Sequence, residues 1–315
     1  MVNIYKTSDP FPDPVLPPRL KKGDIIGIMA PAGPIEKEDD FNSGVRLLHE
    51  MGFETRISSG IMKKQGYLAG SDSHRIKEFH DLWTDREVKA VIAARGGYGS
   101  QRMLSGLDMD LIRHHPKALI GFSDVTALLT AILKHTGLYT FHGPMVTTIA
   151  RGDRESAHTF FRMLTRIKPD NIKPEGLEIL VPGQARGRLA GGNLTSLIHI
   201  MSTAHELNRR NCILFLEDVN EMGYRVDRML THLKDAGRLN GLAGLILGDF
   251  KECGDPEIIW NRVMELLGEE GIPIWANFPV GHGDRNLILP LGIETEMDSA
   301  AGTLNFLQPP FSPAQ

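Results

Sequence analysis

The chain has 315 residues, of which 41% are hydrophobic and 23% charged, so it is long enough for about two domains and too apolar for a disordered protein. Its net charge of −4 provides no basic field to attract nucleic acid, and its two cysteines cannot form a disulfide framework. The sequence has no run of about 18 apolar residues that would predict a membrane span. We therefore expect neither nucleic-acid nor membrane partners.

The first 22 residues are polar and rich in proline. They lack the basic and then apolar order of a secretory signal, and we interpret residues 1–22 as an extended or poorly ordered lead-in. Together with the low cysteine content, this favours a reducing, cytoplasmic location.

Residues 23–167 alternate between short apolar runs, which predict strands, and amphipathic stretches, which predict helices. The predicted strands are 24–32, 53–57, 88–95 and 118–122, and the predicted helices are 41–51, 73–83, 125–134 and 157–167. Strand and helix alternation with continuously apolar strands indicates a parallel sheet covered by helices on both faces. We interpret residues 23–167 as an N-terminal α/β domain.

The pattern changes at residues 168–183, which are rich in proline, glycine and charge and which we interpret as a linker. Residues 184–315 then form a smaller, mixed α/β domain. Its predicted elements are strands at 212–216 and 242–248, a helix at 226–233 and short β segments from 288 onward.

Ser123 is the first candidate for a reactive side chain, because it follows an apolar strand and precedes a helix in the segment GFSD (121–124). The carboxyl ends of parallel strands carry the active sites of α/β folds, and the following helix directs N–H groups to the same point. Such a serine can act as a nucleophile, with the next amide stabilising an oxyanion. The alternative is a helix N-cap, for which serine and aspartate are favoured.

A serine nucleophile needs a base, and two histidines have turn-rich surroundings: His142 in FHGP and His282 in GHGD. Glycines on both sides of His282 allow a tight loop and the close approach of a substrate. A loop histidine that bonds the backbone is the alternative for each. The residues alone do not choose between His142 and His282.

The third group should be a carboxylate at the end of a strand, and Glu217 and Asp218 follow the predicted strand 212–216. The two side chains point to opposite faces, so only one of them can reach a histidine. The other would be a capping or structural residue. In the alternative interpretation, this acidic cluster only pairs with Arg225 and Arg228.

The glycine-rich turn RGGYGS (95–100) also follows a predicted strand, and its bare amides could bind an anion or complete an oxyanion hole. A simple turn is the alternative. The turn matches neither glycine-rich nucleotide signature, and no His, Asp or Glu spacing predicts a metal site. We therefore expect no cofactor and no metal.

Seven segments follow one another in an order that a known family shares. They are GDIIGIMAPAGP (23–34), ARGGYGS (94–100), LIGFSDVTALL (119–129), TFHGP (140–144), RLAGGNLTSL (188–197), LFLEDVNEMGYRVDRMLTHL (214–233) and PVGHGDRNLILPLG (279–292). Together they span nearly all of residues 23–292. In these segments the chain resembles the LD-carboxypeptidase family of serine peptidases (the S66 group), which includes muramoyltetrapeptide carboxypeptidases and microcin-immunity hydrolases.

The resemblance implies that Ser123 is the nucleophile, that His282 is the general base and acid, and that Glu217 orients the imidazole. It thereby selects His282 over His142 and Glu217 over Asp218. Because the serine and the other two residues come from different domains, the active site should lie in the cleft between the domains.

The resemblance also implies an oxyanion hole made by the backbone amides of Gly97 and Asp124. A carboxypeptidase must in addition bind the terminal carboxylate of its substrate, which calls for cationic side chains or bare amides. Arg188 and Arg225 are our candidates for this contact, together with the Gly96–Gly97 turn.

The implied reaction releases the terminal D-alanine from a muropeptide tetrapeptide by hydrolysis of an L,D-peptide bond, within cell-wall recycling, and the resemblance suggests a homodimer. The first alternative is a microcin-immunity hydrolase that cleaves an acyl-amide bond in a peptide- or aminoacyl-nucleotide. That activity needs an aromatic platform for the base, and none of the tryptophans (Trp83, Trp260 and Trp275) lies beside the motifs of the implied triad. The second alternative is a two-domain binding module with an inert cleft.

Overall fold

The strands of the N-terminal region form a parallel sheet. The computed structural model describes residues 11–313. Five strands pair in parallel: β1 (Ile25–Met29), β2 (Glu54–Ile57), β3 (Val88–Ala93), β4 (Ala118–Gly121) and β5 (Thr140–His142). The helices between and after them are α1 (Glu38–Glu50), α2 (Asp72–Thr84), η1 (Ser100–Gly106), α3 (Met109–His114), η2 (Ser123–Val125), α4 (Thr126–Thr136) and α5 (Val146–Ile149).

The order of the first sheet is β11-β5-β4-β3-β1-β2, in which β11 (Leu289–Leu291) pairs antiparallel with β5. From β1 the chain builds outward first to β2 and then, on the other side, to β3, β4 and β5. Such a reversal leaves a crevice outside the carboxyl ends of the strands, which is where open α/β sheets bind ligands.

The second sheet has the order β13-β12-β7-β8-β9-β10-β6. Its strands are β6 (Glu178–Val181), β7 (Gln184–Asn193), β8 (Cys212–Val219), β9 (Gly244–Lys251), β10 (Ile274–Ala276), β12 (Glu294–Asp298) and β13 (Thr303–Phe306). Strands β7 to β10 are parallel, and β6, β12 and β13 are antiparallel. Helix α6 (Arg154–Thr165) precedes this sheet in the chain and packs through Phe161 against Phe53 of the first half. The helices of the second half are α7 (Leu194–His199), α8 (Gly223–Asp235) and α9 (Pro256–Leu267).

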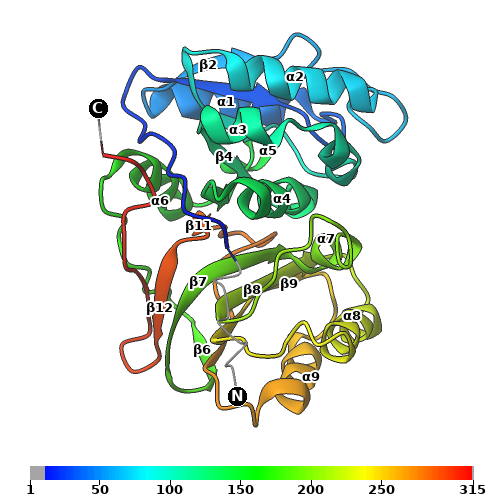
Figure 1. Cartoon of the computed structure of the whole chain (residues 1–315), viewed down its shortest axis with the longest axis vertical. Helices are drawn as coiled ribbons and strands as arrows, with labels where there is room; N and C mark the ends of the chain where they lie inside the picture. Colours follow the sequence, from blue (N-terminus) through cyan, green and yellow to red (C-terminus); the bar gives the residue numbers. More distant parts are fainter. Residues whose placement is uncertain (1–10, 314–315) are drawn as a thin grey trace, which may run out of the picture.

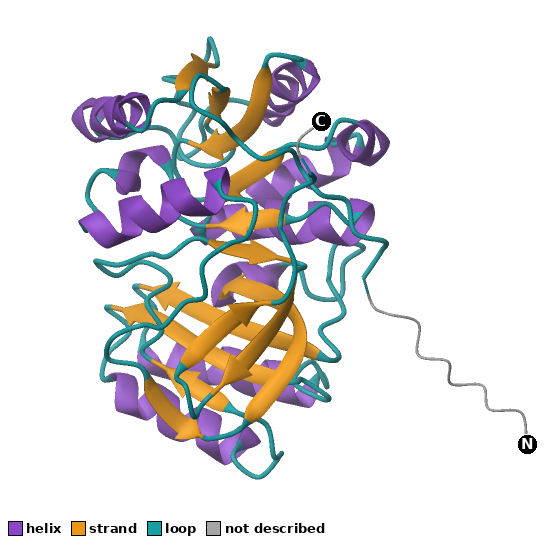
Figure 2. Cartoon of the chain, turned by 90° about the vertical axis from the view of Figure 1, so that its left-hand side faces the viewer, coloured by secondary structure: helices purple, strands orange, loops and turns teal. Residues whose placement is uncertain are grey.

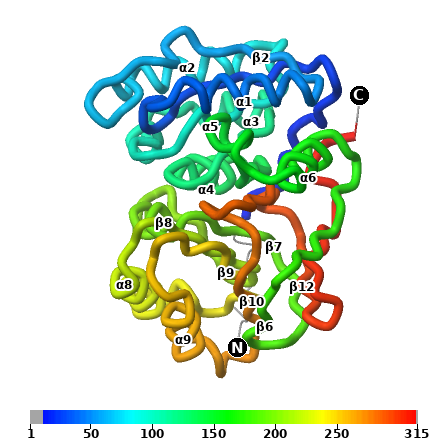
Figure 3. The backbone as a smooth tube through the Cα atoms, turned by 180° about the vertical axis from the view of Figure 1, so that it is seen from behind, coloured from blue at the N-terminus to red at the C-terminus, as the bar shows by residue number. Residues whose placement is uncertain are grey.

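The two sheets lie one above the other, with α4, α6 and β11 near their junction (Figure 1). Figure 2 shows helices on both sides of the upper sheet and further helices below the lower one. Seen from behind, α8 and α9 lie together beside the second sheet (Figure 3). Among residues 11–313, no helix is long and apolar enough to cross a membrane.

Helix α4 shows why the site can form at the junction. Nearly all of its residues are buried, including the threonines Thr126, Thr130 and Thr136, because it packs against the first sheet and also against β7 of the second. A helix that is apolar on all sides is stable only when it is covered on all sides. The carboxyl end of β4 is therefore held against the second sheet.

The predicted α/β fold with two sheets is confirmed, and most predicted strands and helices form within a few residues of their expected bounds. Each sheet nevertheless contains a strand from outside the domain that the sequence predicted for it. Strand β6 lies inside the predicted linker 168–183, and β11, from the C-terminal part, completes the first sheet. The division into 23–167 and 184–315 stays a prediction.

The described part of the lead-in is extended and ordered. Phe11 and Leu20 are buried, Val15 forms a β-bridge with Leu138, and the amide of Ser312 donates to a carbonyl of the lead-in. The lead-in thus packs against both the first half of the chain and its C-terminal end. Residues 1–10 of the predicted lead-in lie outside the described residues.

Candidate active site

Ser123 lies at the carboxyl end of β4, where the chain turns into η2 and α4. Its φ of 61° lies in the left-handed region, which side chains other than glycine rarely adopt. A non-glycine residue held in this conformation costs about 1–3 kcal/mol and occurs at functional turns, where it presents the side chain away from the backbone. Ser123 is half-buried, so its hydroxyl is placed at a strand end rather than in the core.

Glu217 and His282 form the central contact of the site. The imidazole Nδ1 lies 2.6 Å from the carboxylate Oε2, and Glu217 is fully buried. The register of β8 against β9 shifts at Glu217, a bulge of the kind that redirects side chains beside active sites. A side chain at Gly281, which has a φ of 123°, would lie 2.8 Å from the Glu217 carboxylate, so only glycine allows the loop of His282 this close.

The electrostatics of the pair favour a histidine that can accept a proton. Burial acts to lower the pKa of His282, but the charge and hydrogen bond of Glu217 outweigh it and raise that pKa, helped by Asp218 and Asp249. Burial raises the pKa of the Glu217 carboxyl, against the pull of the imidazole. Because Nδ1 faces the carboxylate, Nδ1 carries the hydrogen and Nε2 is left as the acceptor.

The ring of Phe122 connects the histidine to the serine. Its centroid lies 4.7 Å from the centroid of the His282 ring, and Ser123 is the next residue along the chain. No hydrogen bond joins the Ser123 hydroxyl to His282 among residues 11–313. Catalytic hydrogen bonds of this kind are often long before a substrate binds. The structure therefore places the imidazole against the side chain of the residue that precedes the serine.

Asp218 has different partners from Glu217. Its carboxylate accepts hydrogen bonds from the Asn193 side chain (2.9 Å) and from the amide and hydroxyl of Thr195 (2.9 and 2.8 Å). The amide of Asn193 in turn donates to the Thr126 hydroxyl at 3.1 Å. Asp218 thus belongs to a polar network that links the second sheet to α4. The sequence analysis did not single out Asn193, although it ends an unusual GGN segment.

His142, the other candidate base, also contacts the ring of Phe122. It is fully buried, and neither ring nitrogen has a hydrogen-bond partner in the described part of the chain. Burial, and then the charge of His282, lowers the pKa of His142 to about 3. His142 is therefore neutral at pH 7 and packs edge-on against Phe122 and Phe215.

The glycine-rich turn reaches the serine hydroxyl. A Cβ atom at Gly96 would lie 3.1 Å from the Ser123 Oγ, and Gly97 has a φ of 110°. Neither the Gly97 amide nor the Asp124 amide has a hydrogen-bond partner within the described residues. The Asp124 carboxylate accepts from the Ser100 amide at 2.8 Å, which ties the turn to the start of η2. Both amides are therefore available beside the serine.

The two arginines proposed for the substrate carboxylate are not brought together. Arg188 pairs with Cys212 across β7 and β8, whereas Asn193 pairs with Glu217. Arg188 thus lies five residues, or about 17 Å, from the Glu217 end of its strand, where it contacts Glu294 at 3.4 Å. Arg225 is exposed at the start of α8 and contacts Glu221 at 3.6 Å, on the carboxyl side of β8.

A cavity of about 380 Å³ opens beside the imidazole. Phe122, Gly281 and His282 line it, together with two cations, Arg151 and Lys251, that the sequence analysis did not consider. Lys251 ends β9, so the carboxyl edge of the parallel strands was the signal that could have identified it.

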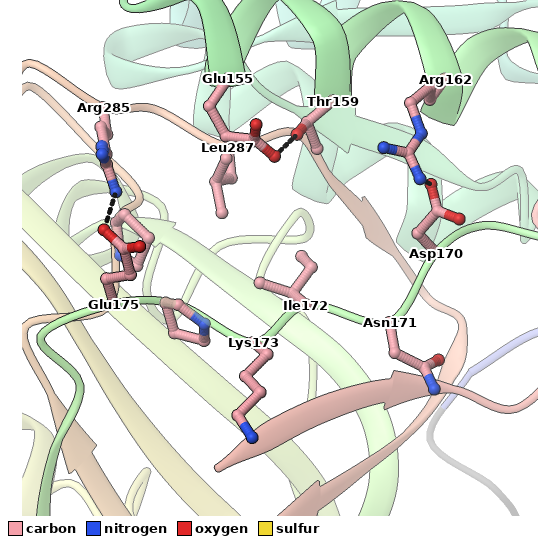
Figure 4. A pocket seen from close by; sticks show the side chains of 12 residues that line it. Glu155, Thr159, Arg162, Asp170, Asn171, Ile172, Lys173, Glu175, Arg285 and Leu287 are labelled. Carbon is pink, nitrogen blue, oxygen red and sulfur yellow. Dashed lines mark hydrogen bonds and ion pairs between the residues drawn. The ribbon is translucent and has the colours of Figure 1, made fainter.

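A second cavity, of about 470 Å³, is shown in Figure 4. It is bounded by α6, the segment 170–175 and the residues around Arg285. Arg285 reaches Glu175 at 3.7 Å, and Arg162 pairs with Asp170 (Figure 4). Two of the arginines in its lining, Arg162 and Arg285, are thus already paired, and no member of the predicted triad lines the cavity.

In the part of the chain that the structure describes, no group of three or more His, Cys, Asp or Glu side chains is placed to hold a metal ion. The arrangement instead consists of a strained serine, a histidine paired with a buried carboxylate, and two free amides. These are the parts that acyl transfer through a serine requires.

Comparison with known proteins agrees with this chemistry. The family model of the LD-carboxypeptidase N-terminal domain matches residues 26–143, and that of the LD-carboxypeptidase C-terminal domain matches residues 186–297. A probable murein peptide carboxypeptidase of Bacillus subtilis is 37% identical over 91% of this chain and 92% of its own length. The murein tetrapeptide carboxypeptidase of Pseudomonas aeruginosa is 30% identical over 85% of this chain and 91% of its own length.

Solved structures show the same fold. The microcin C7 self-immunity protein MccF of Escherichia coli, in complex with aspartyl sulfamoyl adenosine, superposes with a TM-score of 0.89 at 27% identity. The match covers 95% of this chain and all of that one. The likeness therefore extends over both sheets.

Proposed function

This chain belongs to the LD-carboxypeptidase family of serine peptidases, and on that premise we propose that it releases the terminal D-alanine from muropeptide tetrapeptides by hydrolysing the L,D-peptide bond. The observation that carries the proposal is the 2.6 Å pairing of His282 with Glu217 at the carboxyl end of β8, next to the ring of Phe122. This pairing supplies an oriented base whose ring contacts Phe122, the residue before Ser123.

In the proposed reaction, Nε2 of His282 takes the proton of the Ser123 hydroxyl while Oγ attacks the scissile carbonyl carbon. Glu217 keeps the hydrogen on Nδ1 and stabilises the imidazolium that forms. The negative charge on the carbonyl oxygen is met by the amides of Gly97 and Asp124, which have no other partner within the described residues.

Breakdown of the tetrahedral intermediate breaks the C–N bond, and the imidazolium gives its proton to the leaving amine of D-alanine. The peptide remains as an ester on Ser123. Water then attacks the ester carbonyl, His282 accepts a proton from that water, and the serine hydroxyl is restored. The reaction is a hydrolysis and needs no cofactor.

The direct test is mass spectrometry of the tetrapeptide L-Ala-γ-D-Glu-meso-diaminopimelate-D-Ala incubated with wild type and with Ser123→Ala. We expect the wild type alone to remove one D-alanine, because the variant lacks the attacking oxygen. Cleavage by both proteins would remove the serine from the mechanism. Cleavage by neither would remove the muropeptide substrate.

A second candidate function keeps the chemistry and changes the substrate. The structural likeness to MccF bound to aspartyl sulfamoyl adenosine favours an acyl-amide bond in a peptide- or aminoacyl-nucleotide. The identity to this protein is 27%, against 37% for the murein peptide carboxypeptidase, so the peptide substrate comes first. Hydrolysis of the nucleotide amide but not of the tetrapeptide would reverse this order.

The resemblance also leads us to propose a cytoplasmic homodimer that acts in the recycling of cell-wall fragments. Cell fractionation tests the location, and sedimentation of the purified protein tests the dimer. A monomer at micromolar concentration would contradict the second proposal.

A further inference from the structure

Two tyrosines stand exposed next to the predicted oxyanion turn. Tyr67 follows β2, Tyr98 follows β3, and the two residues are 65% and 48% exposed. Their ring centroids lie 5.6 Å apart and their planes are tilted by 59°. Large aromatic side chains that share an exposed face mark a site where another molecule packs. The two rings therefore form an exposed aromatic platform.

The platform lies at the place in the sheet where a ligand is expected. Strands β2 and β3 flank β1, so both tyrosines come from loops at the carboxyl ends beside the reversal of strand order. The loops after β1 and β3 are joined by a hydrogen bond from the amide of Gly33 to the carbonyl of Gly96 at 2.9 Å. This is the crevice in which open α/β sheets bind their ligands.

Tyr98 is held rigidly beside the nucleophile. On one side of it, Gly96 packs against Ser123, and on the other the amide of Ser100 donates to Asp124 at 2.8 Å. The fully buried Arg75 also donates to the carbonyl of Gly99, the residue after Tyr98, at 2.8 Å. Only Gly97 lies between Gly96 and Tyr98, so the Cα atoms of these two residues lie at most about 7 Å apart.

Tyr67 is held by its own turn. The amides of Gln65 and Leu68 each donate to the carbonyl of the other, at 2.8 and 3.1 Å. The amide of Ala69 then donates to the carbonyl of Ala32 in the loop after β1 at 2.9 Å. Because both tyrosines belong to hydrogen-bonded loops, these loops lose little conformational freedom when a ligand packs on the rings.

The charge beside the platform is only partly paired. Arg102, which lies near both phenols, donates twice to the Asp72 carboxylate, at 3.0 and 2.9 Å, and the buried Arg75 donates to the same carboxylate. Two guanidiniums thus share one carboxylate, and the cluster can donate hydrogen bonds to the hydroxyl and acetamido oxygens of a ligand. A pyranose ring has an apolar face, which can pack on the two tyrosines, and hydroxyl groups around its edge, which can bond to the neighbouring polar side chains.

We propose that Tyr67 and Tyr98 bind the amino-sugar ring of a sugar-bearing muropeptide while its stem peptide reaches Ser123. The inference rests on the proposed function. Three stem residues separate the sugar from the scissile bond, a span of about 10 Å when extended. Tyr98 lies within about 7 Å of Gly96, and Gly96 packs against Ser123, so the distance from Tyr98 to the serine is compatible with that span.

The test compares kcat/KM for the tetrapeptide with and without an attached N-acetylmuramic acid. We expect the wild type to prefer the sugar-bearing peptide and Tyr67→Ala to reduce that preference about three- to tenfold. Tyr67→Phe should restore it, because the ring face is kept. Tyr224→Ala is the matched control, since the ring of that exposed tyrosine already faces Arg225 and Arg228 at 5.9 and 5.5 Å.

The outcomes separate the platform from the reaction. An equal preference in wild type and Tyr67→Ala overturns the platform and leaves the peptidase standing. If the wild type cleaves neither peptide, the proposed function fails, and calorimetry of the sugar-bearing peptide with Ser123→Ala decides on the platform. If adding Tyr67→Ala to Ser123→Ala does not raise the dissociation constant of the sugar-bearing peptide, the platform is overturned. Tighter binding of an aminoacyl-nucleotide, lost in Tyr67→Ala, would overturn the sugar in favour of a nucleobase.

Discussion

His142 and His282 face the same aromatic ring and differ in both properties that decide whether an imidazole can move a proton. Their ring centroids lie 5.8 and 4.7 Å from that of Phe122. His282 is paired with the buried Glu217 and lines a cavity, whereas His142 is fully buried and has no hydrogen-bond partner among residues 11–313.

The difference shows what burial does with and without a carboxylate. Without one, the low dielectric penalises the charged form, and the pKa of His142 falls to about 3. With Glu217 in contact, the pKa of His282 is raised although that residue is also largely shielded from water. Two histidines in similar glycine-containing segments, one at the end of β5 and one in a loop, thus become a neutral packing group and a candidate base.

The largest effect should come from removing the paired imidazole. We expect His282→Ala to lower kcat by about 10⁴- to 10⁶-fold, because the serine then has no base. Steady-state hydrolysis of the tetrapeptide measures this, and circular dichroism checks that the variant folds. A variant with a tenth of the wild-type rate would assign the base elsewhere.

A smaller loss should follow when the carboxylate is neutralised. We expect Glu217→Gln to lower kcat by about 10²- to 10⁴-fold, less than the loss of His282, because Glu217 orients the base without reacting. Since the carboxylate raises the pKa of His282 and activity needs the neutral imidazole, the acid limb of the kcat/KM profile should move to lower pH. An unmoved acid limb would contradict the assigned pairing.

The smallest effect on activity should come from the other histidine. We expect His142→Leu to keep kcat within a few-fold, because His142 packs as an apolar group. In the wild type, the unfolded chain binds a proton at this site between pH 6.5 and about 3 and the folded protein does not. Stability therefore falls with acidification by up to about 1.4 kcal/mol per pH unit through this group, and the variant should lose that slope. Urea unfolding at several pH values measures it.

The sequence was sufficient to predict the fold class, the family and the enzyme class, which the comparisons confirm. The fold class followed from local patterns, namely continuous apolar strands with helices between them, whereas the family and the enzyme class followed from the resemblance of seven segments to a known family. The alternation along β8 also predicted that Glu217 and Asp218 have different partners. The catalytic roles stay predictions until variants are measured.

What the sequence could not show depends on contacts between distant segments. Strand β11 has three residues, too few for a period, and only the folded chain shows that it joins β5. Helix α9 was missed although its sequence is amphipathic. The contact between Tyr67 and Tyr98 could not be predicted, because both tyrosines lie in turns and hydrophobic periodicity does not predict where turn residues lie in space.

One measurement tests the contrast between the two histidines most directly: the rate at which a fluorophosphonate labels Ser123, followed by intact-protein mass, in wild type, His282→Ala and His142→Leu. The account predicts labelling at the wild-type rate in His142→Leu and none on the same time scale in His282→Ala, because only His282 can take the hydroxyl proton. Labelling that survives the loss of His282 and disappears with His142 would contradict it.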